Sequence, residues 1–156
     1  MCDLAVLRRL QQGNLCEVVS QTWKPQQLAG QCIGVNMKVL DCAREVLGDD
    51  VEIVIGGVEI GNQQVFGFEP MSTRLHENDD RPRVDLHCWL RCPSDGFLLD
   101  LTLASTLRDK RGYDSSFIPE GTVYIDSCLA DELSIKHIEA ISGDDAIAFI
   151  NTNFRC

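Results

Sequence analysis

The chain has 156 residues, 44% of them hydrophobic, and a formal net charge of −10 at pH 7. This size suits one hydrophobic core, so we expect residues 1–156 to form a single domain. The acidic charge argues against nucleic acids and anionic membrane surfaces as partners, and no segment offers the roughly 18 apolar residues of a membrane span, so we expect a soluble, cytoplasmic protein.

The first third of the chain has helical periodicity. Leucines at helical spacing precede Gly13 and Asn14, where we expect the first helix to stop, and residues 15–23 resume the pattern before Pro25. Residues 32–47 carry apolar side chains at steps of three and four, which predicts a helix with one apolar face that ends at Gly48.

The middle of the chain changes to a period of two. Residues 51–60 alternate and are rich in β-branched side chains, which predicts a strand with a kink or bulge at Gly56 and Gly57, and residues 63–70 are expected to pair with it. Residues 72–83 are a charged loop that resembles a mobile flap or linker.

A hairpin is predicted over residues 84–103. A polar segment follows around 108–116, then a short strand over 122–126, and then a helical part from about Cys128 with a break at Gly143. The order of helices, antiparallel sheet and helix predicts an α+β fold, with helices packed on one sheet.

The register of the hairpin decides whether His87 and Asp100 can meet. An even number of loop residues pairs Cys92 with Phe97, or Pro93 with Gly96, and places His87 and Asp100 on one face as diagonal neighbours. An odd number would place them on opposite faces.

Asp100 lies in an otherwise apolar run, where an ionised carboxylate needs a partner. It could accept hydrogen bonds from backbone amides at a strand end. Alternatively, it could orient His87 and fix its tautomer, leaving the other ring nitrogen free to act as a base.

Most of the eight cysteines are expected to be reduced, buried small hydrophobic residues, because their spacing lacks the density of a secreted disulfide scaffold. Cys32 has the most favourable position for a nucleophile, at the start of the helix over 32–47, where free amides and the helix dipole stabilise a thiolate. It could also be simply the first residue of the apolar helix face. Cys128, after Ser127 at another possible helix start, is the second candidate.

Three short segments together resemble the Cys, His, Asp signature of the transglutaminase-like cysteine enzyme superfamily. They are GQC (30–32), HCW (87–89) and LLDLT (98–102). This superfamily also includes arylamine N-acetyltransferases and, more distantly, papain-like peptidases. The resemblance implies a papain or transglutaminase-like core, in which the nucleophile helix packs on an antiparallel sheet.

The resemblance also implies roles for individual residues. Cys32 would be the nucleophile, His87 the general base and then acid, and Asp100 the orienting carboxylate. Trp89 matches an aromatic residue often found two positions after the histidine, and Gln26 stands six residues before the nucleophile, where papain-like enzymes carry an oxyanion-hole glutamine. Such a contact is worth on the order of 3 kcal/mol in the transition state.

The expected function is thiol-dependent acyl chemistry through a Cys32 thioester, with a peptide, a protein or a small amide or acyl compound as substrate. The enzyme would be a hydrolase if water is the acceptor and an acyltransferase if an amine is, and no cofactor or metal is expected. The sequence departs from the family at Ile33, where relatives often carry an aromatic or polar residue.

Two other functions remain open. One is a non-catalytic protein-binding module that retains the fold. The other is a metal-binding domain that uses Cys88, Cys92 and His87, although residues four apart on a strand share a face that the neighbouring histidine does not. His76 is expected to be solvated, and His137 to be a helix-surface or half-buried residue without a functional role.

Overall fold

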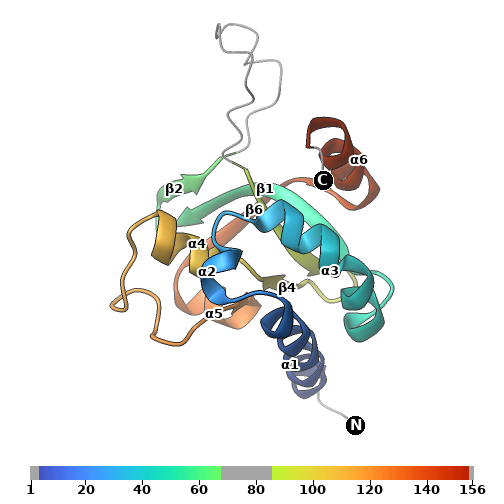
Figure 1. The fold of residues 1–156 in the computed structure, drawn as a ribbon, viewed down its shortest axis with the longest axis horizontal. Helices are drawn as coiled ribbons and strands as arrows, with labels where there is room; N and C mark the ends of the chain where they lie inside the picture. Colours follow the sequence, from blue (N-terminus) through green and yellow to red (C-terminus); the bar gives the residue numbers. More distant parts are fainter. Residues whose placement is uncertain (1–3, 68–85, 155–156) are drawn as a thin grey trace, which may run out of the picture.

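The computed structural model describes residues 4–67 and 86–154, which form a mixed α+β fold with an antiparallel sheet (Figure 1). The helices are α1 (Leu4–Thr22), α2 (Pro25–Leu28), α3 (Cys32–Leu47), α4 (Leu103–Lys110), α5 (Ser127–Glu132) and α6 (Gly143–Asn153). The strands are β1 (Glu52–Ile60), β2 (Gln63–Phe66), β3 (His87–Cys92), β4 (Phe97–Asp100), β5 (Ile125–Asp126) and β6 (Ile135–Ser142). Within the two described ranges, no helix is both long enough and apolar enough to cross a membrane.

Strand β1 is the centre of the sheet. One of its edges pairs with β3 over residues 52–56 and with β2 over residues 58–60, and β6 pairs with the other edge over residues 54–60. Strand β4 then joins β3 to β5, and all of these pairings are antiparallel. The expected pairing of residues 63–66 with β1 is therefore confirmed.

The expected irregularity at Gly56 and Gly57 is also confirmed. The register between β1 and β6 shifts between Ile55 and Gly56. A Cβ atom at Gly56 would lie 1.9 Å from the carbonyl oxygen of Ile138, so the absence of a side chain at Gly56 allows β6 to approach this closely.

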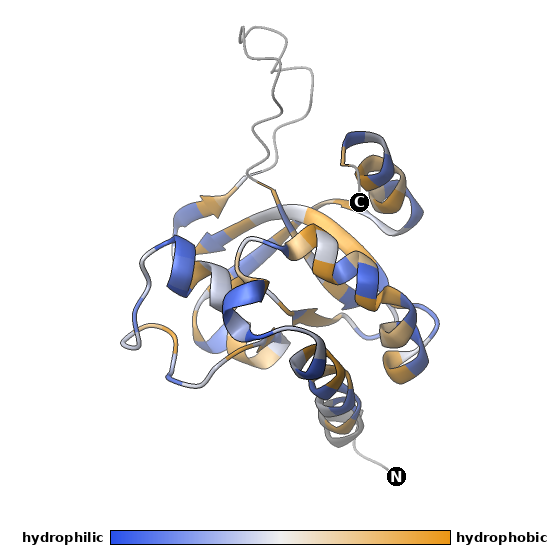
Figure 2. Ribbon diagram, in the orientation of Figure 1, coloured by the Kyte–Doolittle hydropathy of each residue, from blue (hydrophilic) through white to orange (hydrophobic). Residues whose placement is uncertain are grey.

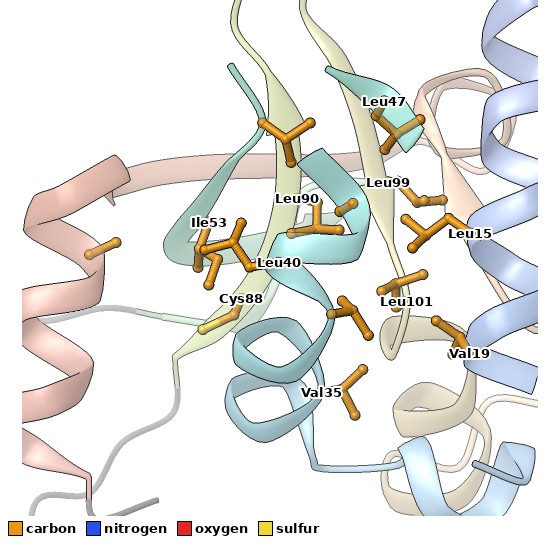
Figure 3. Packing of buried hydrophobic residues seen from close by; sticks show 14 of the residues in the cluster. Leu15, Val19, Val35, Leu40, Leu47, Ile53, Cys88, Leu90, Leu99 and Leu101 are labelled. Atoms are coloured by element: carbon orange, nitrogen blue, oxygen red, sulfur yellow. The ribbon is translucent and has the colours of Figure 1, made fainter. Parts of the chain in front are cut away.

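Apolar side chains cover both faces of the sheet. On one face, α1, α3 and α6 pack against β1, β3 and β4, and Figure 3 shows Leu40 of α3 near Leu90 and Cys88 of β3. A second cluster, under α4 and α5, includes Val58 of β1. Each fully buried aliphatic side chain contributes about 1.5–3 kcal/mol. Figure 2 shows the alternation of hydrophobic and hydrophilic residues along these elements.

The expected stop at Gly13 and Asn14 is wrong, because α1 continues through both residues to Thr22. A glycine inside a helix costs only about 1 kcal/mol relative to alanine. Leu15 and Val19, which follow the glycine, are fully buried in the main core, and this packing outweighs the local penalty.

Two segments after the hairpin also differ from expectation. Residues 103–110 form α4 directly after β4, and residues 135–142 form strand β6, not part of a C-terminal helix. Isoleucines at 135, 138 and 141 are spaced by three, which imitates a helical pattern, but Ser134 has a φ of 55° and separates α5 from β6. The expected break at Gly143 is confirmed, since α6 begins there. The charged loop over 72–83, with His76, lies outside the described residues.

Candidate active site

The structure brings together the three side chains that the sequence singled out. Cys32 is the first residue of α3, His87 the first of β3 and Asp100 the last of β4. The Nε2 atom of His87 lies 2.7 Å from Oδ2 of Asp100, and the Cys32 thiol is in hydrogen-bond contact with the His87 side chain. Because Nε2 faces the carboxylate, Nδ1 is the ring nitrogen left to face the sulfur.

The predicted hairpin register makes this contact possible. Cys92 pairs with Phe97 and Leu90 with Leu99, which is the even-loop arrangement. Continuing this register places Trp89 opposite Asp100, so His87 lies diagonally across from the carboxylate on the same face.

The turn before Cys32 sets the position of the sulfur. Gly30 has a φ of 72°, a conformation that favours glycine, and its amide donates a hydrogen bond of 3.0 Å to Oγ1 of Thr106 in α4. Gln31, the N-cap of α3, makes no side-chain capping bond. The first amides of a helix have no intrahelical acceptor, so the Cys32 sulfur lies at a helix end with donors and a positive partial charge.

Asp100 is fully buried, and both of its oxygens are engaged. Oδ1 accepts hydrogen bonds from the backbone amides of Thr102 (3.2 Å) and Leu103 (2.9 Å), which caps the start of α4. Oδ2 faces the Nε2 atoms of His87 and, at 2.8 Å, of His137. Both kinds of contact expected for Asp100 are therefore present, since one oxygen accepts from backbone amides at the start of α4 and the other faces two imidazole rings, while the role of His87 as a base stays a prediction.

The charges of the three groups support one another. Burial lowers the pKa of His87, but the charge and hydrogen bond of Asp100 and the contact with Cys32 raise it to about 10. Burial raises the pKa of Asp100, and the His87 charge together with hydrogen bonds from His137 and His87 brings it below its ordinary value. At neutral pH, these shifts favour an imidazolium paired with a carboxylate.

The thiol of Cys32 is also affected. A hydrogen bond from the Cys88 side chain lowers its pKa, burial raises it, and the hydrogen bond and charge of His87 lower it again, so that the pKa lies well below the ordinary 9.0. Burial instead raises the pKa of Cys16 to about 12 and that of Cys92 to about 11. Cys32 is therefore in a setting that favours a thiolate, which the settings of Cys16 and Cys92 do not.

Cys128, the second candidate nucleophile, is exposed near the start of α5. The contacts found among residues 4–67 and 86–154 join its side chain to no histidine, whereas Cys32 has one. The structure thus favours Cys32 over Cys128.

His137 is the site residue that sequence reasoning missed. We expected it to be on a helix surface or half-buried without a role, but it lies on β6 with its side chain 3% exposed and shares Oδ2 of Asp100 with His87. Only a strand reading of residues 135–142 could have shown it, because on a strand His137 points to the same face as Ile135, which is buried.

Aromatic rings surround the two imidazoles. Phe66 stacks on His87 with ring centroids 5.0 Å apart, and His137 and Trp89 meet in an edge-to-face arrangement with ring centroids 4.8 Å apart. Trp89 is itself 2% exposed, so it fixes the ring of His137 from inside the fold and is not placed to contact a substrate directly.

Gln26 lies exposed on the short helix α2. Among the contacts of the described residues, none joins its amide to Cys32, His87 or Asp100. Its role in an oxyanion hole stays a prediction.

The contacts around Cys88 also bear on the metal-binding alternative. Cys88 and Cys92 pack in the cluster beneath α3, whereas the His87 ring points to Asp100 on the other face of β3. In the part of the chain that the structure describes, no group of three or more His, Cys, Asp and Glu side chains is arranged to hold a metal ion.

Comparisons with models of protein families, with curated proteins and with solved structures found no match to the chain. Its function must therefore be inferred from the geometry of the site itself.

Proposed function

We propose that the protein is a cysteine hydrolase or acyltransferase that forms a thioester on Cys32. The observation that carries the proposal is the convergence of one thiol, one imidazole and one carboxylate from α3, β3 and β4, with the imidazole of His87 bonded to Asp100 at 2.7 Å and in contact with the Cys32 thiol. A transglutaminase-like core, which the sequence signature implies, is part of the same proposal.

The first half of the reaction would acylate the enzyme. The Cys32 thiolate attacks a carbonyl carbon, and the amides at the start of α3 donate hydrogen bonds to the oxygen that becomes negative. His87 gives its Nδ1 proton to the leaving amine or alcohol as the tetrahedral intermediate collapses to the thioester. Asp100 stabilises the charged ring before this step and holds the neutral tautomer after it.

The second half would release the acyl group. Neutral His87 takes a proton from water or from an amine, which attacks the thioester carbon, and the sulfur of Cys32 leaves as a thiolate. This restores the starting ion pair. Water as acceptor gives hydrolysis, and an amine gives acyl transfer.

The first experiment is alkylation with a limiting amount of iodoacetamide near pH 6, followed by peptide mapping. We expect selective labelling of Cys32 in the wild-type chain and in a Cys128→Ser control, and loss of that selectivity in His87→Ala. Slow, uniform labelling of all cysteines would contradict the proposal and favour a non-catalytic binding module, and preferential labelling of Cys128 would show that the nucleophile is wrong.

The second experiment tests acyl transfer directly. p-Nitrophenyl acetate should give a burst of nitrophenol and an acetyl group that intact-mass and peptide analysis place on Cys32. A Cys32→Ser variant should give no burst. A burst of equal size in that variant would refute the proposal.

A further inference from the structure

A second thiol lies beside the nucleophile. Cys32 packs against the apolar cluster that holds Cys88, and a hydrogen bond between the two side chains lowers the pKa of Cys32 and raises that of Cys88. Asn36, one turn further along α3, holds the two backbones together, since its Nδ2 donates to the carbonyl oxygens of Cys32 at 2.7 Å and of Cys88 at 3.3 Å. The start of α3 and the start of β3 are thus fixed next to each other, with one sulfur on each.

The two sulfurs differ in chemistry and in access. Cys32 is partly exposed, whereas Cys88 is fully buried under α3, where Figure 3 shows it among apolar side chains. The Cys32 hydrogen bond, burial and the Cys32 charge all raise the pKa of Cys88, so Cys88 stays a thiol while Cys32 is ionised. An oxidant from solvent therefore reacts first with the Cys32 thiolate, and the Cys88 thiol lies next to it, further from solvent.

The acyl chemistry proposed above makes no use of Cys88. A hydrogen bond from Cys88 to the thiolate lowers the pKa of Cys32, but it also lowers the nucleophilicity of the sulfur that receives it. A thiol in this position can act in oxidation. A resolving thiol, which attacks a cysteine sulfenic acid to form a disulfide, must lie against the oxidised sulfur.

We propose that Cys32 is a site of reversible oxidation by hydrogen peroxide and that Cys88 is its resolving thiol, so that a Cys32–Cys88 disulfide switches the nucleophile off. The consequence for activity rests on the proposed function, whereas formation of the disulfide does not. A disulfide joins its sulfurs at about 2.05 Å and needs Cα atoms about 4.4–6.8 Å apart, so the link forms only where the starts of α3 and β3 can approach to this geometry.

The reaction balances with the groups present. The Cys32 thiolate attacks one oxygen of peroxide, the O–O bond breaks, and the hydroxide that leaves takes the proton of the His87 imidazolium to become water. The Cys88 sulfur then attacks the sulfenic sulfur of Cys32, the S–O bond breaks, and the leaving hydroxide takes the Cys88 proton to become a second water. The two sulfurs together lose two electrons and peroxide gains them, and a dithiol reagent reverses the change.

The test uses the full reduced chain treated with hydrogen peroxide, digested without reduction and mapped by mass spectrometry. We expect a peptide pair linked through Cys32 and Cys88, loss of iodoacetamide labelling at Cys32, and return of that labelling after dithiothreitol. In Cys88→Ala, Cys32 should instead proceed to sulfinic acid, which dithiothreitol does not reverse.

Cys92→Ala is the matched control. Cys92 is also buried, four residues further along β3 in the same cluster, and it should leave the Cys32–Cys88 link intact. Sulfinic acid at Cys32 in the wild-type chain without any link to Cys88, or a link from Cys32 to another cysteine, would overturn the proposal. If Cys88→Ala does not fold, the presence or absence of the Cys32–Cys88 peptide in the oxidised wild-type chain still tests the proposal.

Failure of this inference can be told apart from failure of the proposed function. The p-nitrophenyl acetate burst is measured on the reduced chain and does not depend on the disulfide, and the linked peptide is measured by mass and does not depend on turnover. A linked peptide without a burst would leave the oxidation site standing and refute the acyl chemistry.

Discussion

Replacing Asp100 by Asn tests whether the carboxylate controls the ionisation of the Cys32 thiol through His87. The substituted amide has one oxygen, which can still accept from the backbone amides that Asp100 caps, so α4 keeps its start. Its NH₂ group would face Nε2 of His87 and of His137, where the carboxylate oxygen now lies. His87 must then accept at Nε2 and carry its proton on Nδ1, and it loses the anion that stabilises its charge.

The structure sets the size of the effect. Burial lowers the pKa of His87, but Asp100 and, to a smaller extent, Cys32 together raise it to about 10 from an ordinary 6.5, so losing the carboxylate removes the larger of the two interactions that keep the ring charged. Without the imidazolium, the Cys32 thiol keeps the hydrogen bond from Cys88 but loses the charge of His87, so its pKa should rise toward the ordinary 9.0, which sets an upper limit on the effect. At pH 6 a thiol with that pKa is ionised in only about one molecule in 10³.

We therefore expect alkylation of Cys32 by iodoacetamide near pH 6 to slow by up to about 10³-fold in Asp100→Asn, with the difference shrinking as the pH approaches 9. Asp126→Asn is the matched control, because Asp126 caps α5 by accepting from the amide of Leu129 at 2.9 Å and has no histidine among its contacts within residues 4–67 and 86–154. Equal rates for Asp100→Asn and the wild type near pH 6 would refute the reasoning, provided that both chains show the same circular dichroism.

Three further predictions follow from the same contacts. His137→Phe removes a donor from Asp100, so the pKa of that carboxyl should rise and the acid limb of the alkylation profile should move to higher pH, while His137→Gln, which keeps an N–H donor, should restore it. Gly56→Ala should lower the urea midpoint by an amount equivalent to about 1–3 kcal/mol, because the new Cβ would lie 1.9 Å from a carbonyl oxygen of β6. Between pH 6.5 and 9, Cys32 and His87 together bind one proton in the folded chain and one in the unfolded chain, so this pair does not make the free energy of unfolding depend on pH. In Cys32→Ser only the raised pKa of His87 remains, so the folded chain binds the extra proton. The free energy of unfolding of this variant, measured by urea titration, should therefore fall as the pH rises above 6.5.

Two parts of the candidate site follow from local signals in the sequence. The helix that begins at Cys32 follows from apolar spacing and a glycine before it, and the contact of His87 with Asp100 follows from the parity of one hairpin loop. Both depend on short stretches of the chain, where periodicity and turn length are informative. The approach of Cys32 to His87, which is 55 residues further along the chain, is expected only from the resemblance of the three segments to a known superfamily.

The partners of the triad depend on contacts that are distant along the chain. Residues of β6 pair with residues of β1 that lie 75 to 88 positions away, and this pairing, not the spacing of its isoleucines, makes residues 135–142 a strand. His137 and Cys88 are site neighbours only because β6 lies against β1 and α3 lies on β3. Periodicity alone predicts a helix for His137, because the pairing of β6 with β1 leaves no local signal. No local pattern marks Cys88 as a neighbour of Cys32 either.

Asp100 links the stability of the fold to the state of the site. A fully buried carboxylate is costly unless it is bonded, and its partners come from α4, β3 and β6. If any one of these elements moves away, the buried carboxylate of Asp100 has too few hydrogen-bond donors. The interactions that favour ionisation of Cys32 therefore also hold β6 and α4 against the hairpin. The site can therefore form only when the C-terminal strand is in place, and a chain that ends before residue 135 should lose the reactivity of Cys32 even though Cys32, His87 and Asp100 are all present.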